Sequence, residues 1–213
     1  MASMTRPDIP QGMSTDAAAT WPPRELIDSF LGNFDFELRP GEATEIGDNE
    51  AAQAAARQFR DTLGRYCSGV TVVTSESGGE PVGMTCQSFA SVSIDPPLIT
   101  FIPMKTSRAW PVMQRAGHFA VNVLAADQAE VSNKMASKGA DKFAGVDWSP
   151  GKTGSPLLAG AIAHIDCTVH AVHDAGDHWI VVGRVQEMDY VVDDEGNSPD
   201  PLLFYQGQYR TTR

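Results

Sequence analysis

The sequence has few cysteines, and their spacing does not suit a metal centre. Cys67, Cys86 and Cys167 contain no Cys-x-x-Cys pair, and any pairing among them leaves one residue over. A disulfide framework or a zinc ribbon needs more cysteines at closer spacing. We therefore expect three buried free thiols, because free cysteine behaves as a small hydrophobic residue.

Basic residues are also scarce. The chain has 16 Lys and Arg against 27 Asp and Glu, a formal net charge of −11. Nucleic-acid backbones are bound by clustered Lys and Arg, so we expect no nucleic-acid partner. The charge is unevenly spread, since residues 1–50 carry a net −7 and the remainder carries only −4.

Long apolar runs are absent. No segment reaches the roughly 18 apolar residues of a membrane helix, and residues 1–20 lack the basic start and apolar centre of a signal peptide. We therefore expect a cytoplasmic protein with no membrane partner. A length of 213 residues suits one domain with an appendage.

The expected appendage is an acidic N-terminal extension, residues 1–46. Residues 1–23 mix Pro, Ser, Thr, Gly and Ala without periodicity, which predicts disorder. Apolar residues recur at helical spacing between Arg24 and Phe36, which predicts a short amphipathic helix. That helix packs on its own domain or on another subunit, or it docks a different protein. Residues 47–213 are the expected folded domain.

Within this domain the pattern predicts several strands and isolated short helices. We expect a first helix that follows an N-cap supplied by Gly47-Asp48-Asn49-Glu50 and reaches Leu63, with Gly64 as its stop. Further helices are expected at 107–115, capped by Thr106 or Ser107, and at 127–137. We expect strands at 70–74, 82–89, 98–102, 118–124, 161–172 and 179–192. Because strands and helices do not alternate regularly, a mostly β, antiparallel barrel is favoured over a doubly wound parallel sheet.

One expected strand is unusually polar. Hydroxyl and amide side chains surround Phe89 where a buried strand would carry aliphatic residues: Thr85, Gln87, Ser88, Ser91 and Ser93. This composition indicates a wall against a polar, flat, partly anionic ligand. Nearby, Lys105, Ser107 and Arg108 stand where a strand ends and a helix begins, which is a reasonable phosphate site.

Two other patterns are not expected to bind ligands. Gly151-Lys152-Thr153 is similar to a phosphate-binding loop, but Val146 stands where that motif requires glycine, so we expect a surface turn. The histidines between 164 and 178 could suggest a metal site. However, His170 and His173 are three positions apart on an expected strand and would face opposite ways, so we expect no metal.

Four segments together resemble the flavin reductase-like family, whose members have an FMN-binding split barrel and serve two-component monooxygenases. They are Phe59–Gly64, Ser68–Thr74, Pro81–Leu98 and Pro201–Gly207. The resemblance covers about residues 57–210. The Cys-Gln-Ser-Phe version at 86–89 is most similar to the branch that serves actinobacterial steroid-ring hydroxylases.

The resemblance implies a set of flavin-binding residues. Pro81, Val82, Gly83, Met84, Thr85, Gln87 and Ser88 would line the ring and ribityl chain, followed by Ile102, Pro103 and Met104. Arg108, Ala109, Lys134 and Met135 would reach the phosphate end, where the position of Lys105 and Ser107 at a helix start already indicated a phosphate site. The choice between FMN and FAD stays open.

The same resemblance implies a nicotinamide side. His178, in Gly176-Asp177-His178, would bind the carboxamide or balance charge as hydride leaves, so it is the candidate catalytic residue. Phe204, Tyr205, Gln206 and Gly207 would close this side, with an aromatic ring available for stacking.

The implied function is an NAD(P)H:flavin oxidoreductase, a homodimer that uses NADH or NADPH to reduce FMN or FAD for a separate monooxygenase. One alternative is a non-catalytic flavin carrier on the same barrel. Another is a relative that oxidises pyridoxamine phosphate or binds a deazaflavin.

Overall fold

The computed structural model describes residues 49–138 and 141–212. The expected extension at 1–46 and its amphipathic helix therefore lie outside the described residues. In the described part, no helix is long and apolar enough to span a membrane.

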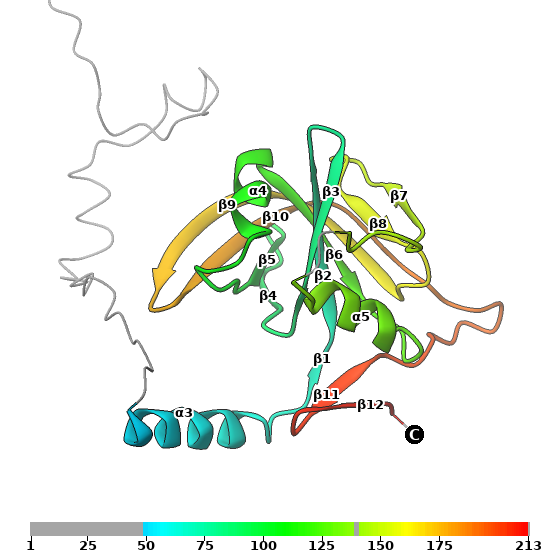
Figure 1. The fold of residues 1–213 in the computed structure, drawn as a ribbon. Helices are drawn as coiled ribbons and strands as arrows, with labels where there is room; N and C mark the ends of the chain where they lie inside the picture. The colour runs from blue at the N-terminus through cyan, green and yellow to red at the C-terminus, as the bar shows by residue number, and fades with distance from the viewer. Residues whose placement is uncertain (1–48, 139–140, 213) are drawn as a thin grey trace, which may run out of the picture. The chain divides into compact units, whose positions relative to one another are not determined.

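The described chain is mostly β, with three helices: α3 (Glu50–Leu63), α4 (Trp110–Ala116) and α5 (Ala129–Ala136) (Figure 1). Every strand pairing is antiparallel, as expected. The strands are β1 (Ser68–Gly69), β2 (Thr71–Ser77), β3 (Glu80–Cys86), β4 (Ala90–Ser93), β5 (Leu98–Phe101), β6 (His118–Val123), β7 (Trp148–Pro150), β8 (Pro156–Leu158), β9 (Ala163–Ala175), β10 (His178–Tyr190), β11 (Leu203–Tyr205) and β12 (Gln208–Arg210).

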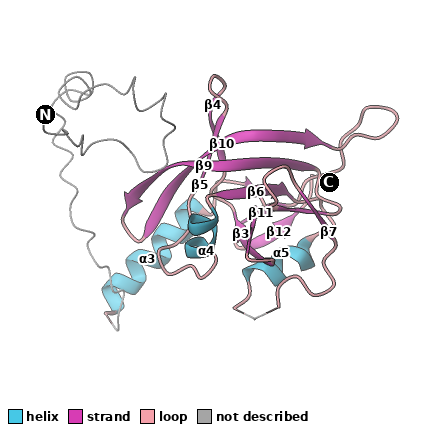
Figure 2. Ribbon diagram, turned by 90° about the horizontal axis from the view of Figure 1, so that it is seen from above, coloured by secondary structure: helices cyan, strands magenta, loops and turns pink. Residues whose placement is uncertain are grey.

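The helices agree with the sequence to different degrees. The α3 prediction is confirmed, and the Asn49 side chain accepts hydrogen bonds from the Ala51 and Ala52 amides as an N-cap. The second helix begins at Trp110, later than expected. Ser107 nevertheless acts at its start, because its Oγ accepts from the Trp110 amide at 3.3 Å. α4 packs on β2 and β6. α5 packs on β2 and on β3, beside which it lies in Figure 2.

Two apolar clusters fill the interior. In one, the Phe101 ring meets the Phe119 ring edge-on at a centroid distance of 4.8 Å and the Trp110 ring at 5.9 Å. Gly183 on β10 lies so close to the Phe119 ring that an added Cβ would clash with it. The second cluster gathers Val70, Val72, Leu124, Met135, Leu158 and Leu202.

The prediction of three buried thiols is correct for two of the three cysteines. Cys86 and Cys167 are buried, and desolvation raises the pKa of the Cys167 thiol to about 12. Cys67 is exposed, so the prediction of a third buried thiol is wrong.

Gly151-Lys152-Thr153 forms a turn between β7 and β8, and the Thr153 amide donates to the buried Asp166 carboxylate at 2.6 Å.

A seven-stranded sheet dominates the fold, in the order β3-β2-β6-β9-β10-β5-β4. Its two edge strands, β3 and β4, are joined by only three residues, Gln87 to Phe89. At about 3.6 Å per residue, Cys86 and Ala90 lie at most about 14 Å apart. Seven flat strands would place the edges about 29 Å apart. The sheet must therefore curl until its edges approach each other.

The expected strand at 82–89 is wrong at its end, because β3 stops at Cys86. Gln87 and Ser88 are exposed and cross from one sheet edge toward the other. The Ser88 hydroxyl anchors this link beside the end of β5: it accepts from the Ile102 amide and donates to the Ile102 carbonyl, both at 3.1 Å. The polar segment is thus the seam of the curled sheet rather than a buried strand.

Removing the Ser88 hydroxyl is expected to loosen this seam. Ser88→Ala leaves both backbone groups of Ile102 without their partner, so the free energy of unfolding should fall by about 1 kcal/mol in urea denaturation. Ser91→Ala, at an exposed position on β4, is the matched control and should change it by no more than about 0.5 kcal/mol. Equal effects of the two variants would contradict the role given to Ser88.

Candidate functional site

The site is built around the outer edge of β3. The Gly83 carbonyl accepts a hydrogen bond from outside the sheet, from Lys142 Nζ at 3.2 Å. Because backbone groups alternate along an antiparallel edge strand, those of Pro81 and Thr85 face outward as well. Pro81 lacks an N–H, and proline is tolerated at such outward positions. The edge therefore presents the Gly83 and Thr85 amides together with carbonyl acceptors.

The side chains of β3 contact different neighbours. The Met84 sulfur receives a hydrogen bond from Ser107 Oγ at 3.7 Å, which connects β3 to the segment before α4. The Thr85 hydroxyl instead donates to the Ser132 carbonyl on α5 at 2.5 Å. β3, which the sequence places at the flavin ring, thus contacts both segments that the sequence places toward the phosphate.

The tip of the β9–β10 hairpin pairs with residues 103–105. The Trp179 amide donates to the Pro103 carbonyl at 2.9 Å, and the Lys105 amide donates to the Asp177 carbonyl at 2.8 Å. Met104 and His178 stand opposite each other in this short bridge. Met104 is 49% exposed, so it offers an apolar surface beside the imidazole. The candidate catalytic histidine is therefore next to the expected flavin segment.

His178 is held by its neighbour. Its Nδ1 lies 2.7 Å from Asp177 Oδ1. The hydrogen bond from His178 lowers the pKa of the Asp177 carboxyl below its usual range. This contact orients the ring, with Nε2 as its remaining polar atom.

The cations expected to bind the phosphate do not converge on one place as predicted. Lys105 forms an ion pair with Asp174 at 2.6 Å, and its ammonium lies 4.7 Å from the centroid of the Trp179 ring. Its charge is thus directed to the hairpin tip. Arg108 is exposed, and the neighbouring Ala109 is buried. Of the two cations in this segment, Arg108 is the more exposed one.

The α5 residues divide in the same way. Lys134 contacts the Ala144 carbonyl, and its side chain is partly accessible. Met135 is fully buried, and its sulfur would lie 2.8 Å from a Cβ added to Gly83. Its side chain therefore belongs to the core. Lys142 was missed by the sequence reasoning, because a lysine in a loop has no periodic pattern that marks it.

Phe204 to Gly207 form the β11–β12 hairpin. Gln206 adopts a positive φ of 52°, and its amide donates to the Gly64 carbonyl, at the end of α3, at 3.0 Å. The Phe204 and Tyr209 rings meet edge-on at 5.5 Å, and the Tyr209 hydroxyl donates to Ser132 Oγ at 2.8 Å. The contacts that the structure describes for this hairpin run to β1, α3 and α5 rather than to His178.

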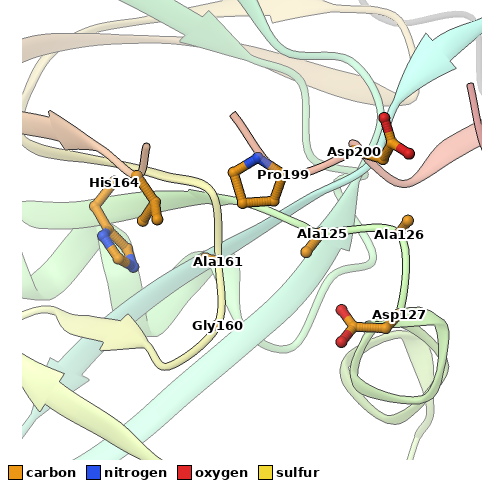
Figure 3. Close-up of a pocket in the computed structure, with 9 residues that line it drawn as sticks. Ala125, Ala126, Asp127, Gly160, Ala161, His164, Pro199 and Asp200 are labelled. Atoms are coloured by element: carbon orange, nitrogen blue, oxygen red, sulfur yellow. The ribbon is translucent and has the colours of Figure 1, made fainter. Parts of the chain in front are cut away.

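An open cavity of about 580 Å³ lies elsewhere, between the ends of β6, β9 and β10 (Figure 3). Its lining includes Ala125, Ala161 and Pro199, with His164 at one side. None of the expected site residues lines it. In residues 49–138 and 141–212, no group of three or more His, Cys, Asp or Glu side chains is arranged to hold a metal ion.

Comparison with known proteins identifies the family. The family model described as "Flavin reductase like domain" matches residues 63–213. The flavin-dependent monooxygenase reductase subunit HsaB of Rhodococcus jostii is 48% identical over 165 residues, which cover 76% of this chain and 82% of that protein.

Solved structures agree. Nitrilotriacetate monooxygenase component B from Mycobacterium thermoresistibile superposes with a TM-score of 0.73 at 48% identity, over 76% of this chain and 88% of that one. The Streptomyces globisporus NADH:FAD oxidoreductase SgcE6, in complex with NAD and FAD fragments, gives 0.68 at 36% identity, over 74% and 92%. With a family match over most of the chain, and with relatives at this identity, the chain belongs to the flavin reductase-like family.

Proposed function

We propose that the protein is an NAD(P)H:flavin oxidoreductase that reduces FMN or FAD and supplies reduced flavin to a separate monooxygenase. The observation that carries the proposal is the pairing of residues 103–105 with Asp177 to Trp179, which brings Met104 and His178 together. Support also comes from relatives whose names describe reductase subunits of monooxygenases.

The residues present fit a flavin. A flavin ring has hydrogen-bond donors and acceptors on one edge, and the outward backbone of β3 supplies complementary groups at Gly83 and Thr85. Exposed Gln87 and Ser88 extend this polar edge. Arg108 and Lys134 supply positive charge for a phosphate. When bound, the flavin supplies an acceptor for the hydride of NADH or NADPH.

The protein's own residues then bind and orient the flavin and the nicotinamide. The β3 edge holds the ring, and exposed Met104 provides an apolar surface at the place where His178 stands. The His178 ring, held by Asp177 through Nδ1, would present Nε2 as an acceptor for an N–H of the nicotinamide carboxamide. No protein nucleophile is required for this reaction, because positioning and electrostatics are what the chain contributes.

A closed split barrel and a homodimer belong to the same proposal. The three-residue link between the sheet edges supports closure. The exposure of helix α3 supports the proposal of a second chain, because none of its residues is buried and Phe59 and Leu63 are 66% and 56% exposed. An isolated helix of about 12–15 residues is only marginally stable in water. The β11–β12 hairpin, which contacts the end of α3, would close the nicotinamide side within that dimer.

We expect purified protein to oxidise NADH or NADPH rapidly only when FMN or FAD is added, because reduced flavin leaves to serve the oxygenase. Steady-state absorbance at 340 nm, with each nucleotide and with FMN, FAD or no flavin, measures this. A yellow protein that binds flavin tightly but oxidises neither nucleotide would contradict the proposal and favour a flavin carrier.

His178→Ala should lower kcat/KM for the pyridine nucleotide by about 3- to 10-fold, the loss of one hydrogen bond, with little change in KM for flavin. His173→Ala is the matched control, because His173 is an exposed histidine of the same hairpin. The same loss in both variants would contradict the role of His178.

Light scattering should give twice the 22.9 kDa mass of one chain. Phe59→Glu should shift the equilibrium toward monomer, because it places a charge in the apolar face of α3. Gln58→Glu adds the same charge at an exposed neighbour and should leave the dimer intact. A monomeric wild-type protein would contradict the homodimer.

A further inference from the structure

Lys142, which no sequence pattern marks, holds two elements beside the proposed flavin edge. Its Nζ donates to the Met135 carbonyl, at the end of α5, at 2.6 Å and to the Gly83 carbonyl on β3 at 3.2 Å. An ammonium group has three N–H donors, so one remains for a further acceptor. The lysine is thus fixed at the outer edge of β3 with a donor to spare.

The position of Lys142 is set by close packing. A Cβ on Gly83 would lie 2.8 Å from Met135 Sδ and 3.3 Å from the Phe143 ring, so both side chains pack closely against β3 at this glycine. Lys142 precedes Phe143 and shares this placement. A cation held this firmly loses little side-chain entropy when a ligand binds.

The charge of Lys142 is poorly compensated. Partial burial lowers its pKa through desolvation. No carboxylate forms an ion pair with it in the described ranges, and Asp141 Oδ1 instead accepts from the Ala144 amide at 2.9 Å. A neutral amide side chain could donate to a carbonyl with a smaller desolvation cost. A cation is favoured here when an anion binds beside it.

The surrounding charge has the same sign. Residues 131–146 contain Lys134, Lys138 and Lys142 against Asp141 alone, although the whole chain carries −11. Lys134 contacts the Ala144 carbonyl while Lys142 contacts that of Met135. Two ammonium groups therefore hold the segment after α5 from its two ends, next to β3.

We propose that Lys142 binds the phosphate of the flavin, with Lys134 beside it. The inference rests on the proposed function, because it assumes that the β3 edge holds a flavin. The shared chemistry is a phosphate group, which FMN carries as a monoester and FAD as a diphosphate. Riboflavin has the same ring and ribityl chain without it. Lys142 acts in binding and takes no part in hydride transfer.

The test compares FMN with riboflavin, without any pyridine nucleotide, by quenching of flavin fluorescence. Lys142→Met should raise the Kd of FMN by about 10-fold or more, the loss of one charge-assisted hydrogen bond, and change that of riboflavin less than about 2-fold. Lys142→Arg should keep most of the FMN affinity. Lys152→Met is the matched control, because Lys152 Nζ also donates to a backbone carbonyl, that of Gln186, at 3.3 Å.

Equal weakening of FMN and riboflavin would overturn the inference, since Lys142 would then only support the backbone of β3. An unchanged FMN affinity would overturn it as well. If Lys142→Met does not fold, Lys142→Gln keeps a donor and removes the charge, so it carries the same comparison. A wild-type protein that binds FMN but oxidises no nucleotide would contradict the proposed function and leave this inference standing.

Discussion

The short link between the two edge strands is the constraint on which the rest of the structure depends. Three residues connect β3 to β4 although these strands stand at opposite ends of the seven-stranded order. A sheet with tied edges cannot lie flat. Ser88 secures the crossing by bonding both backbone groups of Ile102. The next residues, 103–105, then meet the β9–β10 hairpin tip, which places His178 at the proposed site.

Electrostatics divides the basic residues by partner. Lys105 is committed to Asp174 and to the Trp179 ring, so it stabilises the hairpin tip. Lys134 and Lys142 contact backbone carbonyls, which bind a cation without neutralising it. Lys105 is thus a structural cation, whereas Lys134 and Lys142 keep the positive charge that we propose receives a phosphate. Counting basic residues along the sequence cannot make that distinction.

We propose one physical explanation for the exposed apolar face of α3 and the position of the β11–β12 hairpin, namely a homodimer. A helix with no buried residue gains little from its own domain, and the hairpin beside its end contacts α5 rather than His178. Apposition with a second copy would bury the helix face. It would also bring aromatic side chains to the nicotinamide side, so assembly and catalysis would depend on the same surface.

Local patterns in the sequence were sufficient to predict the antiparallel, mostly β class, the helix α3 with an N-cap within residues 47–50, and the polar character of residues 85–88. Each of these patterns depends on neighbouring residues. The family resemblance named β3, residues 102–104 and His178. Only the tertiary structure showed that Gln87 and Ser88 form a seam rather than a strand, that Lys105 pairs with Asp174, that Met135 is buried, and that Lys142 reaches Gly83. These outcomes depend on contacts between residues 14 to 69 positions apart, which only the folded arrangement of strands, helices and loops brings together.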